Sequence, residues 1–153
     1  MNNNSDGEPL YGNSSREHWR LVHDQNTASE ILHELCDVLP TFLIERVAEH
    51  KKASPETLTR LSLHDDPIVR TAVCENPNTP VDVLEYLVND DCPDVRYAMA
   101  ENHNLANNLL ITLCDDDNPY VSSRAQKTLL RLQQNKTIHG QFNFGLHDRR
   151  QFG

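Results

Sequence analysis

The chain has 153 residues, of which 37% are hydrophobic and 24% are charged, and its formal net charge is −9. This length predicts one domain, and the acidic balance opposes nucleic-acid binding, which requires a basic face that neutralises phosphate. Because no segment approaches the roughly 20 apolar residues of a membrane span, and residues 1–12 lack the basic-then-apolar pattern of a secretory signal, we expect a cytoplasmic protein that binds no membrane.

The N-terminal part predicts a disordered segment, then a lone helix, and then a pair of helices. Residues 1–14 are polar and rich in asparagine, and we expect them to be disordered. Residues 16–23 predict a lone capping helix that contains Trp19. The Thr-Ala-Ser-Glu run at 27–30 has the capping-box pattern of a helix start, and Pro40 precedes a second helix.

A 26-residue repeat occupies the middle of the chain, in the gapless units 47–72, 73–98 and 99–124, and its register extends back over about 21–46. Six positions are identical in the three gapless units. They are Glu49/Glu75/Glu101, Leu58/Leu84/Leu110, Leu61/Leu87/Leu113, Asp65/Asp91/Asp117, Pro67/Pro93/Pro119 and Val69/Val95/Val121. A repeat of this length is the sequence signature of a stacked helical architecture.

Each unit predicts two short helices of about nine or ten residues, of which the second is the shorter. The two shared leucines stand three residues apart, so they lie on one face of the first helix. Ser54-Pro55 and Thr79-Pro80 both read as an N-cap followed by proline at the first helical position. Pro93 then opens the second helix of its unit.

The C-terminal part predicts a cap and a tail. We expect the repeat domain to cover residues 15–135, with its cap at 125–135, and residues 136–153 to form a flexible basic and aromatic tail. One longer helix leads into the cap, and three leucines cover the last open face of the repeats: Leu129, Leu130 and Leu132. The recognition candidates of the tail are Phe142, Phe144, Arg149, Arg150 and Phe152.

The motif order E-N-P-N-T-P, V-x-x-L-x-x-L and D-x-x-P-x-V-R resembles the leucine-rich repeat variant family. Residues 73–98 match it best, and the resemblance covers about 24–134. It implies an all-α fold, a short right-handed α-solenoid of about four two-helix repeats with helical caps, similar to HEAT-type and armadillo-like proteins. The resemblance implies no activity. The iron–sulfur segment of some relatives is not expected, because only Cys36 stands in that place.

The four cysteines are interpreted as structural. Cys36 and Cys114 hold the same repeat position three units apart, which places them about 30 Å apart if stacked helices are roughly 10 Å apart. The four thiols therefore cannot bind one metal ion. Cys92 differs, because it stands at an expected N-cap where a helix N-terminus lowers a thiol pKa, and a reactive Cys92 stays open as an alternative.

The acidic runs recur in register, which favours turn chemistry over calcium binding. They lack the glycine and the distal glutamate of a calcium loop. We expect Asp65, Asp91 and Asp117 to cap the second helix of each unit or to reach Arg70 and Arg96.

Positions that vary between the units are the candidates for binding, since repeat proteins bind along an extended surface. Tyrosine offers amphipathic contact area there. The expected acidic binding face consists of Tyr86, Tyr97, Tyr120, Asp82, Glu85, Asp94 and Arg60. The alternative is a solvated helix surface with incidental tyrosines.

No nucleophile elbow, phosphate loop or dinucleotide fingerprint occurs in the sequence, and no cofactor is predicted. The leading hypothesis is a monomeric, non-enzymatic adaptor or regulator that holds a protein partner on its helical surface and through its tail. The alternatives are a solenoid with a small-molecule role, such as a chromophore lyase, and a metal or redox protein.

Overall fold

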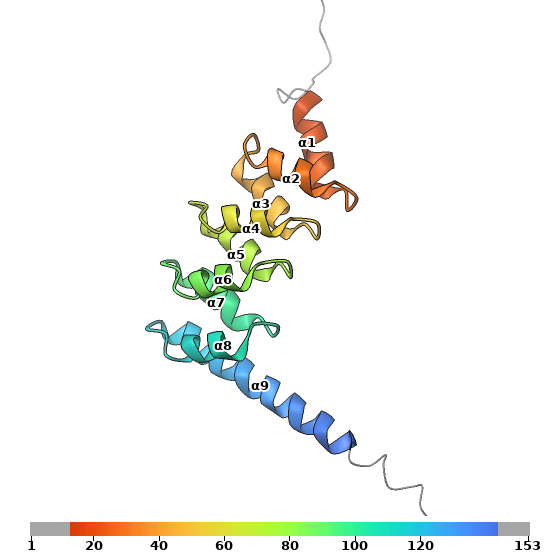
Figure 1. Ribbon diagram of the computed structural model, residues 1–153. Coiled ribbons are helices and arrows are strands. Elements are labelled where there is room, and N and C mark those ends of the chain that lie inside the picture. The colour runs from red at the N-terminus through yellow and green to blue at the C-terminus, as the bar shows by residue number, and fades with distance from the viewer. Residues whose placement is uncertain (1–12, 144–153) are drawn as a thin grey trace, which may run out of the picture. The chain divides into compact units, whose positions relative to one another are not determined.

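The computed structural model describes the backbone of residues 13–143 and the side chains of residues 15–134. Over these residues the chain forms nine helices and no strand, as Figure 1 shows. This confirms the predicted all-α class. No helix in the described part is both long and apolar enough to span a bilayer.

The chain divides into two compact units, Met1–Val83 and Leu84–Gly153, and the boundary falls inside helix α6 (Val81–Leu87). The first unit holds α1 (Asn13–His23), α2 (Ser29–Leu35), α3 (Thr41–Glu49), α4 (Pro55–Leu61) and α5 (Pro67–Glu75). The second unit holds α7 (Pro93–Glu101), α8 (Asn107–Cys114) and α9 (Pro119–Asn143). In the first unit α3 packs on α5, and in the second unit α7 and α8 pack on α9.

Helix starts follow the sequence repeat. The helices α5, α7 and α9 begin at Pro67, Pro93 and Pro119, because proline needs no N–H partner in the first turn and its fixed φ suits the helix. The second helix of a 26-residue repeat is nine residues long in α3, α5 and α7. The first helix of a repeat has seven residues in α2, α4 and α6. The prediction that the second helix is the shorter one is therefore wrong. Helices α4 and α6 end at the second shared leucine because turn-forming residues such as Asn89 and Asp90 follow soon after, whereas α8 ends one residue later, at Cys114.

One of the predicted helix caps is confirmed. Ser54 Oγ accepts a hydrogen bond from the N–H of Thr57 at 3.2 Å, and Pro55 opens α4. The capping box at 27–30 is wrong, because the N-cap of α2 is Ala28 and no side chain bonds there.

The two threonines that were expected to help start a helix instead close the helix before it. Thr79 donates its hydroxyl to the carbonyl of Val73 at 2.6 Å, and Thr27 donates to the carbonyl of Leu21 at 2.6 Å. Both side chains are buried, so each hydroxyl needs a partner inside the protein. A carbonyl near a helix C-terminus can accept this bond, because no further helical turn follows to supply its usual i+4 N–H. The Thr79-Pro80 cap is therefore wrong, and α6 begins at Val81.

The core consists of the repeated apolar positions. Five of the six shared leucines are buried: Leu58, Leu61, Leu87, Leu110 and Leu113. Leu84 is only half-buried, while its neighbour Val83 is buried. Val47 of α3 and Val73 of α5 are fully enclosed in the first unit.

The last helix differs from its prediction in length and in its buried face. Helix α9 continues past residue 135, because the first glycine after that point is Gly140 and no proline follows. Its buried residues are Val121, Ala125 and Thr128, which share one face at i, i+4 and i+7 spacing. Leu130 is exposed and Leu129 and Leu132 are half-buried, so the three leucines do not jointly cover this side of the unit.

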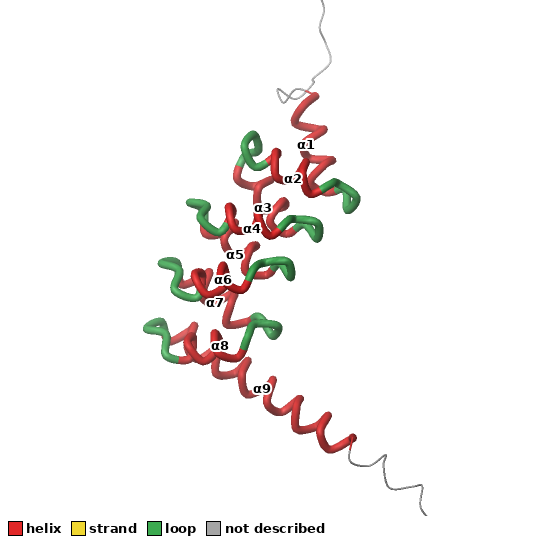
Figure 2. Tube along the Cα trace, viewed as in Figure 1, coloured by secondary structure: helices red, strands yellow, loops and turns green. Residues whose placement is uncertain are grey.

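Figure 2 shows how the turns of the first unit are arranged. The turns that join α2 to α3 and α4 to α5 lie on one side, and the turns that join α1 to α2 and α3 to α4 lie on the opposite side.

Candidate functional site

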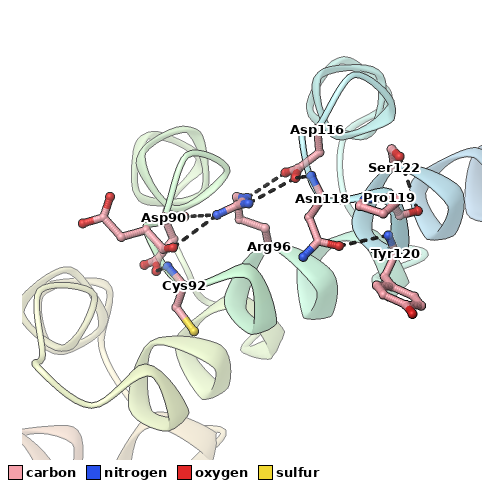
Figure 3. Close-up of polar contacts among 9 residues, drawn as sticks. Asp90, Cys92, Arg96, Asp116, Asn118, Pro119, Tyr120 and Ser122 are labelled. Atoms are coloured by element: carbon pink, nitrogen blue, oxygen red, sulfur yellow. Dashed lines mark hydrogen bonds and ion pairs between the residues drawn. The ribbon is translucent and has the colours of Figure 1, made fainter.

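Arg96 of α7 and Asp116, in the turn before α9, form a well-enclosed ion pair in the second unit (Figure 3). Arg96 Nε donates to Asp116 Oδ2 at 2.7 Å and Nη2 donates to Oδ1 at 3.1 Å, a bidentate arrangement. Arg96 Nη1 also donates to the Asp90 carbonyl at 2.5 Å. The hydrogen bond from Arg96 lowers the pKa of Asp116. The carboxylate that meets Arg96 is thus Asp116, rather than the predicted Asp117.

Both repeat arginines also donate hydrogen bonds to backbone carbonyls of the turn before their own helix. Arg70 Nη1 donates to the carbonyls of His64 at 2.7 Å and Asp65 at 3.0 Å, and Arg96 Nη1 lies 3.5 Å from the Asp91 carbonyl. The predicted contact between a repeat aspartate and a repeat arginine is therefore present in the repeats 47–72 and 73–98. The arginine meets the backbone carbonyl of the aspartate, and not its carboxylate. The arginines hold the turn between the two helices of a repeat.

The helix caps fall one residue after the aspartates that were predicted to form them. Asp66 accepts from the N–H of Ile68 at 2.9 Å, and Asn118 accepts from the N–H of Tyr120 at 2.9 Å. With proline at the first helical position, the residue before it takes the extended conformation of an N-cap. Cys92 occupies this position in α7, where no side chain forms a cap hydrogen bond.

An acidic hollow of about 660 Å³ lies along these turns in the second unit. Its lining is Val88, Asn89, Asp90, Asp91, Arg96, Ile111, Thr112, Leu113, Asp115, Asp116 and Asp117. Five aspartates against one arginine leave it strongly negative, and Asp91, Asp115 and Asp117 are exposed. Within the described part of the chain, no group of three or more His, Cys, Asp or Glu residues could hold a metal ion.

A second hollow, of about 310 Å³, lies between the N-terminal ends of α7 and α9. We call it the tyrosine hollow, and its lining is Pro93, Asp94, Tyr97, Asn118, Tyr120 and Val121. Tyr120 is 78% exposed, and Figure 3 shows its ring pointing away from Arg96 and Asp116. Tyr97 is half-buried and Asp94 is exposed. The structure therefore brings together three of the predicted binding residues.

The other predicted binding residues do not line this hollow. Tyr86 and Glu85 are exposed on α6, and Asp82 and Arg60 belong to the first unit. Arg60 forms an ion pair with Asp37 there, so its guanidinium already has a partner. Of the tail candidates, Phe142 lies in α9, but its side chain is outside the described residues. Phe144, Arg149, Arg150 and Phe152 also lie outside the described residues.

A basic hollow on α9 was missed by the sequence reasoning. It measures about 300 Å³, and its lining is Arg124, Lys127, Thr128, Leu130, Arg131 and Gln134. Arg124 Nη2 also pairs with Glu101 at 3.0 Å. The signal was the i, i+3, i+7 spacing of the three basic residues, which places them on one helix face.

The cysteines are free thiols, and two of them, Cys36 and Cys74, are buried. Burial raises the pKa of the Cys36 thiol, and burial together with the neighbouring Asp115 raises that of Cys114. Both effects disfavour the thiolate, which is the nucleophilic and metal-binding form.

No family model matches the chain, and neither a curated protein nor a solved structure matches it. The resemblance to the leucine-rich repeat variant family thus depends on the repeat residues alone.

Proposed function

We propose that this chain is a non-enzymatic protein–protein interaction module, an adaptor or regulator, whose tyrosine hollow binds a segment of a partner protein. The observation that carries the proposal is the hollow itself, in which Tyr97 and Tyr120 stand beside the exposed carboxylate of Asp94. The proposed architecture is a short HEAT-like α-solenoid in the style of the leucine-rich repeat variant family.

The chemistry of the tyrosine hollow suits a peptide segment. A tyrosine ring provides apolar contact area and its hydroxyl bonds a peptide group, which is why tyrosine is common in binding hot spots. Asp94 adds a negative charge at the edge, so a lysine or arginine of the partner gains a complementary contact. The acidic hollow in the same unit extends this preference for a basic partner.

Hydrogen bonds that recur between repeats support the solenoid part of the proposal. In the first unit Asn76 Nδ2 donates to the carbonyls of Ala48 at 2.6 Å and His50 at 3.1 Å. In the second unit Thr128 Oγ1 donates to the carbonyl of Ala100 at 2.7 Å. Each bond joins residues 26 or 28 positions apart, as expected when neighbouring repeats stack.

Two single substitutions in the full chain test the proposal. Tyr120→Ala removes the most exposed ring of the tyrosine hollow, and Tyr86→Ala removes an exposed tyrosine (58%) that does not line it. Affinity capture with cross-linking from native lysate should lose at least 90% of the bound partner with Tyr120→Ala and retain it with Tyr86→Ala. Circular dichroism checks that both variants keep their helix content.

Equal capture by the two variants would contradict the proposal, because a ring inside the hollow would then contribute no more than a ring outside it. Equal loss would also contradict it, because the binding surface would not be specific to the hollow.

A further inference from the structure

The basic hollow on α9 is a surface of the second unit that the proposed function does not use. Its three cations are Arg124, Lys127 and Arg131. Helix α9 contains no aspartate or glutamate in its 25 residues, although the whole chain has a net charge of −9. The charge of this helix is therefore opposite to that of the chain.

Comparison of the repeats shows that these cations are not part of the shared helical scaffold. Lys127 stands 26 residues after Glu101, at the position where the three gapless units all have glutamate. Arg131 takes the position that Leu105 has one repeat earlier. The sign of the charge is thus reversed at an otherwise uniform position, which the packing of helices does not require.

The cations are not neutralised by their surroundings. Lys127 and Arg131 are exposed, and neither forms an ion pair with another residue of the described part. Arg131 Nη1 lies 3.5 Å from His103 Nε2. Arg124 pairs with Glu101 at 3.0 Å, but its Nε has no hydrogen-bond partner among the described residues. One carboxylate against three cations leaves the basic hollow with a net positive charge.

The spacing of Lys127 and Arg131 suits two carboxylates of one peptide segment. Four residues of helix rise about 6 Å, and side chains on one face of an extended peptide repeat about every 7 Å. Leu130 is exposed in the same hollow and offers apolar contact to the methylene groups of a glutamate. We propose that the basic hollow binds an acidic segment of a partner protein, with the carboxylates of a Glu-x-Glu sequence on Lys127 and Arg131.

A short acidic segment is a better occupant than a long polyanion. The acidic hollow of the same unit includes Asp115, Asp116 and Asp117, in the turn before α9. Arg124 stands five residues after Pro119, where α9 begins, a rise of about 7.5 Å that is similar to the Debye length of about 8 Å at physiological salt. The negative charge of a nucleic acid or an anionic bilayer extends over a larger area and is repelled by these aspartates.

Fluorescence anisotropy with the full-length chain tests the site. The probe is the peptide Thr-Glu-Thr-Glu-Thr-Glu with an uncharged fluorophore, and the same peptide with glutamine in place of glutamate is the reference. The chain should bind the acidic probe and not the reference. Lys127→Gln with Arg131→Gln should weaken binding of the acidic probe at least tenfold.

A second double variant is the matched control. Lys51→Gln with Lys52→Gln also removes two positive charges from exposed positions, but in the first unit, and should change binding of the acidic probe less than twofold. Circular dichroism should show unchanged helix content in both double variants, because the substituted side chains are exposed.

Three results would overturn the inference. They are no binding of the acidic probe, an equal loss in the two double variants, and tighter binding of a thymidine oligonucleotide or of anionic phospholipid vesicles than of the probe. The inference goes beyond the proposed function, because it concerns another surface and a segment of opposite charge. Tyr120→Ala should leave binding of the probe unchanged, so failure of the proposed function and failure of this inference give different results.

Discussion

Arg96 of α7 holds Asp116 by two parallel hydrogen bonds of 2.7 and 3.1 Å and also donates to the Asp90 carbonyl, and so joins the turn after α6 to the turn after α8. Only 18% of the arginine side chain and 7% of the aspartate side chain are exposed. A pair with this geometry is worth more than an exposed ion pair, because solvent and salt screen it less. Its removal should therefore give a measurable loss of stability.

Asp116→Ala should lower the free energy of unfolding by about 2 kcal/mol, because it leaves the mostly buried Arg96 guanidinium without its charged partner. Asp117→Ala, at the exposed neighbouring position, should change it by no more than about 0.5 kcal/mol. Urea denaturation followed by circular dichroism measures both. Equal effects would mean that the pair contributes no more than a surface charge.

The same pair should make stability depend on pH. Because Arg96 lowers the pKa of Asp116 below the ordinary value of 3.8, the ionised carboxylate is favoured in the folded protein. The stabilisation is therefore complete well above pH 4 and is lost as the pH falls through the folded-state pKa. The difference in unfolding free energy between wild type and Asp116→Asn, measured by urea denaturation from pH 7 to pH 3, should shrink toward the acid end. A constant difference over this range would contradict the assignment.

Two leucines of one helix should differ in their contribution to stability. Leu87 is fully buried, whereas Leu84 is half-buried although it holds an equally shared repeat position. Leu87→Ala should cost about 2–5 kcal/mol, and Leu84→Ala should cost less than half as much because less apolar surface is lost. Thermal unfolding of the two variants, compared with wild type, checks the order. The reverse order would contradict the burial described here.

His50 should tolerate asparagine but not alanine. The side chain is buried, its Nε2 lies 3.0 Å from the Asp24 carbonyl, and its Nδ1 accepts from the N–H of Lys52 at 3.1 Å. Asn76 holds the position equivalent to His50 in the next repeat, and its Oδ1 accepts from the N–H of Asn78 at 2.9 Å. His50→Ala removes both hydrogen bonds, including the acceptor of the Lys52 N–H, and should cost about 1–3 kcal/mol. His50→Asn should cost less than about 1 kcal/mol, as measured by urea denaturation. A similar cost for the two variants would show that the hydrogen bonds are unimportant.

Helix positions were predictable where a proline fixes the backbone. The starts of α5, α7 and α9 follow from Pro67, Pro93 and Pro119, because the preference of proline for the first helical turn is local. The caps were less predictable. Thr79 has the residue type of an N-cap, but burial gave its hydroxyl a different acceptor, the Val73 carbonyl, and burial depends on packing that a local pattern does not contain.

The candidate site was predictable only in part for the same reason. Comparing the repeats identified Tyr97 and Tyr120 as variable positions, and they do line one hollow. The same comparison also selected Tyr86 and Arg60, but Tyr86 does not line that hollow and Arg60 is paired with Asp37. Variation between repeats indicates exposure, whereas the grouping of exposed residues is decided by which helices pack together.

The hydrogen bonds of Asn76 to Ala48 and of Thr128 to Ala100 have a consequence for how the protein reaches its native state. Each joins residues only 28 positions apart, so forming one of them closes a short stretch of chain and costs little entropy. Helical proteins dominated by contacts of this kind fold in microseconds to milliseconds. A nascent repeat therefore finds these partners as soon as the next 28 residues have followed it, without waiting for distant parts of the sequence.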